Sequence, residues 1–549
     1  MKFPYVGLFL LLLIINHSCD PIEPVPEALE IYSLSINGNL TNDLKGSTVL
    51  PEIRVSFNKP VDVSIAQNVI ILSENGLAAA LSIISENDDS TLIIRPKNPL
   101  KYITKYDFII YNQLASKSGE TLNNALQASL TTEVDPTPKF STISDEVLLT
   151  LVQEQTFRYF WEFGHPVSGL ARERNNSGDL VTSGGSGFGI MSILVGIERG
   201  FITRQQGLDR LLIMTDFLKN TAERFHGVFP HWLNGVTGKA IAFSTKDDGG
   251  DLVETSYLIA GLLAASAYFD KTGADEATLR QTIKDIWETV EWSWHTKNGQ
   301  NVLYWHWSPK YNWEMNHQIR GYNEALITYV LAAASPTYPI SKEVYEQGWA
   351  QNGSIKNGKS FYGISLPLGY DYGGPLFFAH YTFLGINPLG LTDQYANYQV
   401  QVVNHSKINH AYCVSNPRKF YGYNDECWGL TASDNNTGYS AHSPTNDKGI
   451  ISPTAALSSM PYTPAESMEA LKYFYYILGD KTFREFGFID AFSLHYGWFA
   501  SSFLAIDQGP IIVMIENHRT GLIWDLCMNQ PDFRHGLTKL GFSSTKYNF

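Results

Sequence analysis

The hydrophobic pattern of the chain changes period at one short segment, Asp135-Pro-Thr-Pro-Lys139. Before this segment lie short β-rich runs, such as IRVSFNKPVDV and YDFIIYN, separated by Asn, Asp, Gly, Pro and Ser. After it, apolar residues recur at helical spacing, beginning with LLTLVQEQTFRYFWEF. A period of two residues is typical of strands, and a period of about 3.6 of helices. The sequence therefore predicts two domains of different class, joined by a linker at residues 135–140.

The N-terminal part, residues 31–134, is predicted to be an all-β sandwich. The spacing of its β-rich runs and turn residues fits about seven strands. No cluster of acidic, basic or nucleophilic side chains in it indicates chemistry. We expect it to act as a spacer or packing module.

The C-terminal part, residues 141–549, is predicted to be all-α. Long runs of paired helices with little strand pattern between them favour an (α/α)6 toroid barrel. The predicted helices are 148–163, 204–219, 251–269, 275–292, 320–334, 391–405, 464–478 and 495–506. Gly-, Asn- and aromatic-rich loops such as 295–319 and 406–460 connect them.

The first residues, MKFPYVGLFLLLLIINHSC, indicate an export signal at 1–19. Their apolar stretch is too short for a spanning helix, and Cys19 follows a small Ser, as at a bacterial lipoprotein cleavage site. Residues 20–30, DPIEPVPEALE, form a Pro- and acid-rich spacer. We therefore expect a lipid on Cys19 and anchorage to the bacterial outer membrane, on the periplasmic or the cell-surface side. Plain secretion and a retained membrane anchor are the alternatives.

Composition excludes several classes of function. The net charge is −14 with no basic tract, so nucleic acid is not an expected partner. The 14 histidines are scattered, and the cysteines beyond Cys19 have no metal spacing, so no metal and no cofactor is predicted. The glycine-rich stretch SGGSGFGIM lacks the Lys and the preceding strand of a phosphate loop. Aromatic residues make up 13% of the chain and include 12 Trp, which suits a cleft for sugar rings.

The stretch KDDGGDLVETSYLIAGLLAASAYFD places four carboxylates at the start of an apolar helix. Asp251 and Glu254 have the spacing of a capping box, in which Asp251 accepts from the first turn and Glu254 reaches back. Asp247 and Asp248 would then be solvated loop residues. Alternatively, the four acids form a catalytic cluster, with Gly249 and Gly250 allowing a substrate to approach. The residues alone leave both interpretations open.

Other acids and aromatic residues lie in loops or at predicted helix starts. Asn323 and Glu324 open an apolar helix, where Glu324 also suits the helix dipole, and Arg320 is close enough to hold its carboxylate or a sugar hydroxyl. Asp507 is interpreted as a helix cap, and Glu516 as a buried partner of Arg519. Trp428, amid amides and acids, is a candidate sugar platform. The further candidates for sugar binding are Asp247, Asp248, Trp307, Asp371 and Asp434.

Five segments carry a resemblance to a known family: KDDGGDLVETSYLIAGLL, NHQIRGYNEALITYVLAAASPTYPI, YDYGGPLFFAHYTFLGINP, ECWGLTASD and ISPTAALSSMPYTPAESMEAL. Over residues 140–549 the chain resembles the glucoamylase-like bacterial domain classed as glycoside hydrolase family 144. Residues 31–133 resemble the immunoglobulin-like (Ig-like) modules that precede surface enzymes of Bacteroidetes-type bacteria. The resemblance implies an (α/α)6 barrel that hydrolyses β-1,2-glucans with inversion. Some members cut internally, and others release sophorose from chain ends; by analogy, the N-terminal module favours the second mode.

The resemblance places Asp247, Asp251 and Glu254 in an acidic cluster of the cleft, with Glu324 opposite them. It implies that Asp251, Glu254 and Glu324 are catalytic. Our hypothesis is that Glu324 is the general acid and that the Asp251/Glu254 pair activates water. The expected partner is a glucan or glucooligosaccharide, bound by a monomer. Two alternatives remain, namely a hydrolase of another glucan on the same barrel and a non-catalytic glycan-binding lipoprotein.

Overall fold

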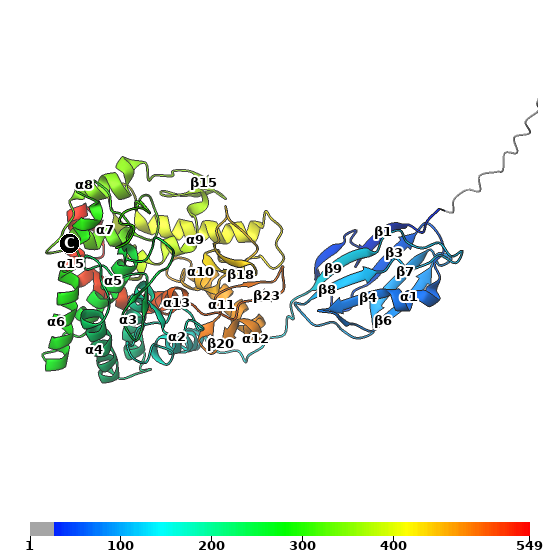
Figure 1. The fold of residues 1–549 in the computed structure, drawn as a ribbon, viewed down its shortest axis with the longest axis horizontal. Helices are drawn as coiled ribbons and strands as arrows, with labels where there is room; N and C mark the ends of the chain where they lie inside the picture. Colours follow the sequence, from blue (N-terminus) through cyan, green and yellow to red (C-terminus); the bar gives the residue numbers. More distant parts are fainter. Residues whose placement is uncertain (1–26) are drawn as a thin grey trace, which may run out of the picture. The chain divides into compact units, whose positions relative to one another are not determined.

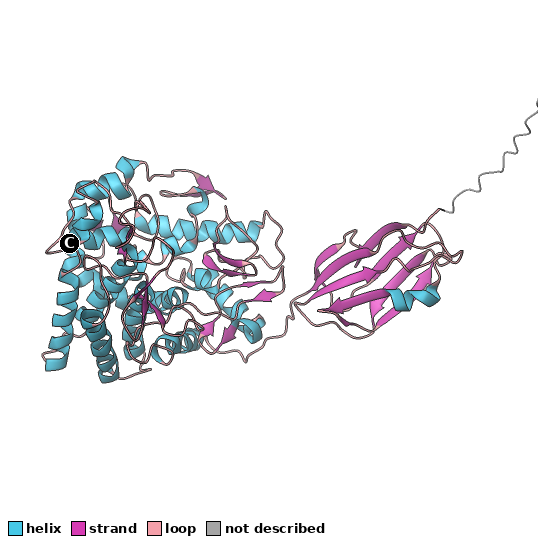
Figure 2. Cartoon of the chain, in the orientation of Figure 1, coloured by secondary structure: helices cyan, strands magenta, loops and turns pink. Residues whose placement is uncertain are grey.

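The computed structural model describes residues 27–549, which fall into two compact units that divide between Glu133 and Val134 (Figure 1). The predicted signal peptide, its Cys19 and residues 20–26 of the spacer lie outside the described residues. Between residues 27 and 549, no helix has both the length and the apolar character needed to cross a bilayer. The β-rich first unit and the helical second unit confirm the predicted order of the two classes (Figure 2).

The first unit consists of two β-sheets and one short helix, α1 (Val63–Val69). One sheet has the order β1 (Ile31–Ile36), β3 (Ile53–Phe57), β7 (Thr91–Pro96), β6 (Leu81–Glu86), and all its pairs are antiparallel. The other has the order β2 (Asp43–Ser47), β9 (Leu126–Thr132), β8 (Lys105–Ile110), β4 (Ile70–Glu74), β5 (Leu77–Ala78), with β2 parallel to β9. The nine strands exceed the predicted seven, because short strands such as the two-residue β5 leave little periodic pattern in the sequence.

Strand β3 shows how this unit buries its core. Ile53, Val55 and Phe57 are buried while the residues between them are partly exposed, as expected for a strand with one face inside. Apolar residues from both sheets, including Leu72 and Phe108 of the second, join the same buried cluster. The unit is therefore a sandwich around one hydrophobic core.

The second unit is built mainly of helices, which Figure 1 labels in chain order. They are α2 (Asp145–Trp161), α3 (Ser183–Glu198), α4 (Arg204–Asn220), α5 (Leu252–Tyr268), α6 (Ala274–Glu288), α7 (Leu326–Ala334), α8 (Lys342–Val344), α9 (Tyr398–Ser415), α10 (Pro453–Leu457), α11 (Pro464–Lys472), α12 (Gly479–Thr482), α13 (Ala505–Arg519), α14 (Leu522–Asn529) and α15 (Pro531–Leu540). Short strands lie in the loops between them: β10 (Leu180–Thr182), β11 (Trp232–Asn234), β12 (Ala240–Ile241), β13 (Gly250–Asp251), β14 (His306–Trp307), β15 (Ser360–Phe361), β16 (Ile364–Ser365), β17 (Leu391–Thr392), β18 (Ala432–Asn435), β19 (Gly438–Ala441), β20 (Phe483–Arg484), β21 (Gly487–Phe488), β22 (Phe492–Ser493), β23 (Trp498–Phe499) and β24 (Ser543–Ser544).

Helices α3, α5 and α13 form the centre of this unit. Nearly all residues of each are buried, which is the pattern of a helix surrounded by other elements. Helix α3 packs against both of the others, and glycines permit the close approach to α5. A Cβ on Gly187 would lie 2.2 Å from the carbonyl oxygen of Tyr257, and one on Gly261 would lie 2.3 Å from that of Gly187.

Four sequence expectations about helices need correction. The segment 495–506 is not a helix, because it holds β23 and a loop, and α13 begins only at Ala505. The helices predicted at 320 and 391 begin at Leu326 and Tyr398. The turn before α7 contains Gly321 at φ +76°, which a helix cannot accommodate. Finally, the glycine-rich stretch at 183–191 opens α3, a helix that the sequence did not predict because glycine disfavours helices.

Candidate active site

Glu254 and Glu324 line one cavity of about 380 Å³ in the helical unit. Short strands bring loop residues to its wall, since β10 pairs with β11 and β13 with β14. Most of the wall is aromatic or apolar. The other lining residues are Glu173, Arg174, Thr182, His231, Trp232, Phe243, Trp305, Phe377, Tyr381, Ala432, Tyr439, Leu504 and Ile506.

Glu254 lies in the first turn of α5, but its side chain crosses to the start of α3. Its Oε2 accepts a hydrogen bond from the Gly184 amide at 2.9 Å and lies 3.5 Å from Thr182 Oγ1. The predicted capping box is therefore wrong for Glu254, because the side chain caps the neighbouring helix and not its own. Burial raises the pKa of Glu254, while the charge of His231 and the Gly184 amide act in the opposite direction.

Asp251 is the N-cap of α5, as the capping interpretation predicted. Its Oδ1 accepts from the amides of Val253 and Glu254 at 3.0 and 2.9 Å. Its Oδ2 lies 3.1 Å from His231 Nδ1 and 3.7 Å from His306 Nε2. Burial would raise the pKa of Asp251, but the hydrogen bond from His231 and the two histidine charges hold it below its usual value. The cavity wall formed by the described residues does not include Asp251.

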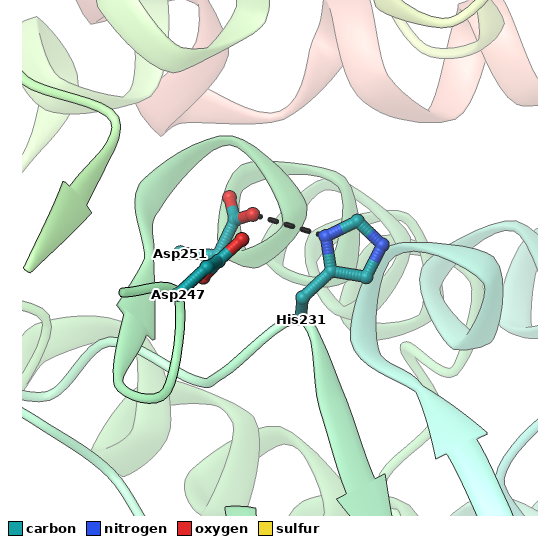
Figure 3. Close-up of side chains that lie close together, drawn as sticks. All are labelled: His231, Asp247 and Asp251. Atoms are coloured by element: carbon teal, nitrogen blue, oxygen red, sulfur yellow. Dashed lines mark hydrogen bonds and ion pairs between the residues drawn. The ribbon is translucent and has the colours of Figure 1, made fainter. Parts of the chain in front are cut away.

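His231, Asp247 and Asp251 converge next to the cavity, and Figure 3 shows the bond between His231 and Asp251. One potential ligand atom from each of the three residues lies within 4.8 Å of the others, which is close enough for one metal ion. However, His231 and Asp251 already bond to each other. Burial opposes a charge on His231, yet Glu254 and Asp251 raise its pKa to about 9. The arrangement therefore fits an ion pair, and the expectation of no metal remains a prediction.

Asp247 is buried beside this ion pair. Its Oδ2 lies 3.4 Å from His306 Nε2, and its Oδ1 has no hydrogen-bond partner among the described residues. Burial and the negative charge of Asp251 raise its pKa to about 7. Asp247 therefore belongs to the acidic cluster that the sequence predicted, one layer behind the cavity wall.

Glu324 lies in the turn before α7, with its main chain fixed from two sides. Its carbonyl oxygen accepts from the Tyr257 hydroxyl at 3.3 Å and from the Thr382 hydroxyl. Burial raises the pKa of the Glu324 carboxyl to about 7, and the negative charges of Glu254 and Asp251 add to this. Glu324 therefore holds a proton to higher pH than an ordinary carboxyl group does.

Four predicted sugar-binding residues have structural partners outside the cavity wall. Asp248 accepts from Ser308 Oγ at 2.5 Å and fixes a loop. Trp307 pairs with Gly250 in the β13–β14 ladder and does not line the cavity.

Arg320 also has other partners. It donates to Gln318 and to the carbonyl of Gln347, so it does not hold the Glu324 carboxylate. Asp371 is exposed and pairs with Lys359.

Trp428 is wrong as a sugar platform. Its side chain is fully buried, and its indole N–H donates to the Glu466 carbonyl at 3.2 Å. No face of the ring is open to a sugar. Asp434, in contrast, lies next to the cavity, where it accepts from Arg174 Nη1 at 3.2 Å and from Ser502 Oγ at 2.6 Å.

The structure also places at the cavity residues that were not among the predicted site residues. His231, Trp305, Tyr381 and Tyr439 line the cavity. His231 and Trp305 stand in aromatic-rich segments, which is the one sequence signal that pointed toward them. Glu516 pairs with Arg199 at 2.6 Å and not with Arg519, which corrects its predicted partner.

Comparison with known proteins agrees with the order of a β-rich Ig-like unit and a helical unit. Residues 316–531 match a family model described as "Putative glucoamylase", and residues 35–142 match one described as "Bacterial Ig-like domain". A solved structure described as a "putative glucoamylase" from Bacteroides uniformis is 56% identical, with a TM-score of 0.73; the match covers 74% of this chain and 100% of that one. The endo-β-1,2-glucanase from Chitinophaga pinensis, solved with sophorotriose and glucose, is 52% identical with a TM-score of 0.72, over 73% of this chain and 99% of that one.

A curated relative from Parabacteroides distasonis is named exo β-1,2-glucooligosaccharide sophorohydrolase (non-reducing end). It is 46% identical over 72% of this chain, and the match spans 58% of the relative's length. The helical unit with its acid-lined cavity thus falls in the class of glucoamylase-like domains. The chain belongs to this family, glycoside hydrolase family 144, and carries an N-terminal bacterial Ig-like domain.

Proposed function

We propose that the protein hydrolyses β-1,2-glucan or β-1,2-glucooligosaccharides. The observation that carries the proposal is that Glu254 and Glu324 line one cavity in different electrostatic surroundings. Glycoside hydrolysis needs two carboxyl groups, one protonated and one ionised. The linkage comes from the relatives, whose names specify β-1,2-glucan or its oligosaccharides.

In the proposed mechanism Glu324 is the general acid. Its pKa of about 7 leaves it protonated below neutral pH and partly protonated at neutral pH, so it can donate a proton to the oxygen of the leaving sugar. Glu254 is the base, which acts in its ionised form; burial raises its pKa, and the charge of His231 and the Gly184 amide offset part of that rise. It removes a proton from the water that attacks the anomeric carbon from the opposite face, which inverts the configuration.

Asp251 is a positioning residue in this mechanism. It fixes the start of α5 through two amide hydrogen bonds and holds His231 at the cavity wall. The two residues of the predicted Asp251/Glu254 pair therefore have different roles: Glu254 faces the substrate, and Asp251 positions the start of α5 and His231. The barrel that carries these residues is proposed to be an (α/α)6 toroid, which the central position of α3, α5 and α13 supports.

We propose release of sophorose from chain ends as the mode of action, in line with the name of the curated relative. Internal cutting is the alternative, because a relative at 52% identity is named an endo-β-1,2-glucanase. Attachment to a membrane through Cys19 is a separate proposal, which rests on the sequence of residues 1–19 alone.

The test is a time course of products from the chain lacking residues 1–19. Linear β-1,2-glucan is the substrate, and β-1,3-glucan and starch are the controls. Sophorose as the sole early product supports the proposal and the chain-end mode, whereas a ladder of longer products changes the mode to internal cutting. Release from another polymer alone would overturn the substrate, and release from none would favour the glycan-binding alternative.

A further inference from the structure

A row of aromatic rings leads from the cavity wall to the protein surface. Tyr381 and Phe377 line the cavity, and their rings stack with centroids 5.1 Å apart. Phe378 touches Phe377 edge-on at 4.7 Å. Tyr370 follows at 6.3 Å from Phe378, with the two ring planes 36° apart. The row therefore continues outward from the carboxylates without a break.

The outermost ring belongs to Tyr370, which faces solvent from a turn with a fixed main chain. Its side chain is 62% exposed, and its carbonyl accepts from the Gly373 amide at 2.9 Å. Gly369 and Gly373 on either side have φ of +86° and +95°, and a Cβ on Gly373 would lie 2.1 Å from the His405 ring. Two glycines thus fix a turn that presents one large aromatic side chain to water. The exposed ring of Tyr370 is therefore available to a partner at the outer end of the aromatic row.

Polar groups stand beside Tyr370. Asp371 accepts from Asn357 Nδ2 at 3.1 Å and pairs with Lys359 at 2.9 Å, and both ion-pair partners remain exposed. An aromatic face next to amide, carboxylate and ammonium groups matches the two surfaces of a pyranose, whose C–H face is apolar and whose edge carries hydroxyls.

We propose that Tyr370 and Phe378 form an outer sugar subsite, which binds the part of a glucan chain that extends beyond the cavity. The inference rests on the proposed function and adds a preference for chain length to it. Asp371 does not line the cavity, but in this subsite it would contact the sugar bound at Tyr370. The occupant is a further stretch of the same glucan, because the aromatic row is continuous with the cavity wall.

The test compares Tyr370→Ala with the wild type on linear β-1,2-glucooligosaccharides of increasing length. We expect the ratio of kcat/KM on long chains to kcat/KM on the trisaccharide to fall about five- to tenfold, the effect of losing one ring contact. The loss should appear in KM, and Tyr370→Phe should restore the wild-type ratio because it keeps the ring. Tyr362→Ala is the matched control, since Tyr362 is 43% exposed but contacts Tyr372, outside the row.

An unchanged ratio in Tyr370→Ala, with an active wild type, would overturn the subsite and leave the proposed function standing. An equal fall of the ratio in Tyr362→Ala would also overturn it. A wild type that releases no product from any length would overturn the proposed function, and the subsite with it.

Discussion

The amide of Gly184, at the start of α3, lies 2.9 Å from Oε2 of Glu254 on α5. The N-cap residue of α3, Thr182, makes no capping bond with its own side chain, so the neighbouring helix supplies the acceptor. A carboxylate at this point also interacts favourably with the helix dipole. One side chain therefore fixes two central helices relative to each other and stands at the cavity wall. The position of the proposed base depends directly on the packing of α3.

The first prediction concerns Gly184→Ala. A Cβ at this position would lie 2.2 Å from Glu254 Oε2, so the carboxylate must move. We expect kcat to fall about a hundredfold, because a displacement of this size near the chemistry is costly. Steady-state kinetics on β-1,2-glucan measure the effect. Gly273→Ala is the control, since it lies in open space before α6, and it should keep kcat. If Gly184→Ala kept the kcat of the wild type, catalysis would not depend on the position of the Glu254 carboxylate beside the Gly184 amide.

The second prediction concerns Glu254→Gln and Glu324→Gln. Each variant should lose about 10²- to 10⁴-fold in kcat, the usual contribution of a general acid or base. In Glu254→Gln the side-chain carbonyl oxygen can still accept from the Gly184 amide, so Tm should stay close to that of the wild type. Glu314→Gln changes a half-exposed acid that pairs with Lys246, and it should be neutral. If Glu254→Gln lowered Tm but kept kcat, Glu254 would be a structural cap only.

The third prediction is the pH dependence of kcat/KM. Glu324 must be protonated to act as an acid, and burial raises its pKa to about 7. Loss of this proton should therefore give an alkaline limb, in which activity falls by about tenfold per unit as the pH rises above about 7. The measurement is a pH profile from about pH 4 to pH 9. The alkaline limb should disappear in Glu324→Gln assayed on an aryl glycoside, whose leaving group needs no proton. A profile flat between about pH 6 and pH 9 in the wild type would remove Glu324 from the acid role.

The sequence predicted those features that depend on local pattern. The two-domain order, the helix at α5 and the capping role of Asp251 all follow from residues within a few positions of one another. It could not predict where the Glu254 side chain points, because its partner Gly184 is 70 residues earlier in the chain. Helix α3 was missed for a related reason. Its glycines disfavour a helix locally, but close packing against α5 requires them.

The prediction that Trp428 binds sugar was wrong because the polar composition of its loop was taken to mean that the Trp428 ring is exposed. Acids, amides and glycines surround Trp428 in the sequence, yet its ring is buried and its N–H bonds to α11. Glu324 was predicted to be a site residue, and it does lie in the cavity wall. Its predicted position inside a helix was wrong, because α7 begins only at Leu326. Burial is decided by contacts between distant segments, which a single sequence does not reveal.

The fourth prediction is that removal of metal ions leaves the activity unchanged. His231 Nδ1 and Asp251 Oδ2 lie 3.1 Å apart and bond to each other, and the raised pKa of His231, about 9, keeps the imidazole protonated at neutral pH. A protonated imidazole has no free nitrogen lone pair for a metal. Enzyme dialysed against EDTA should therefore keep its kcat and Tm, and added zinc or manganese should shift neither. Loss of activity on dialysis, restored by one of these cations, would contradict the ion pair and make His231, Asp247 and Asp251 metal ligands, with His231 neutral.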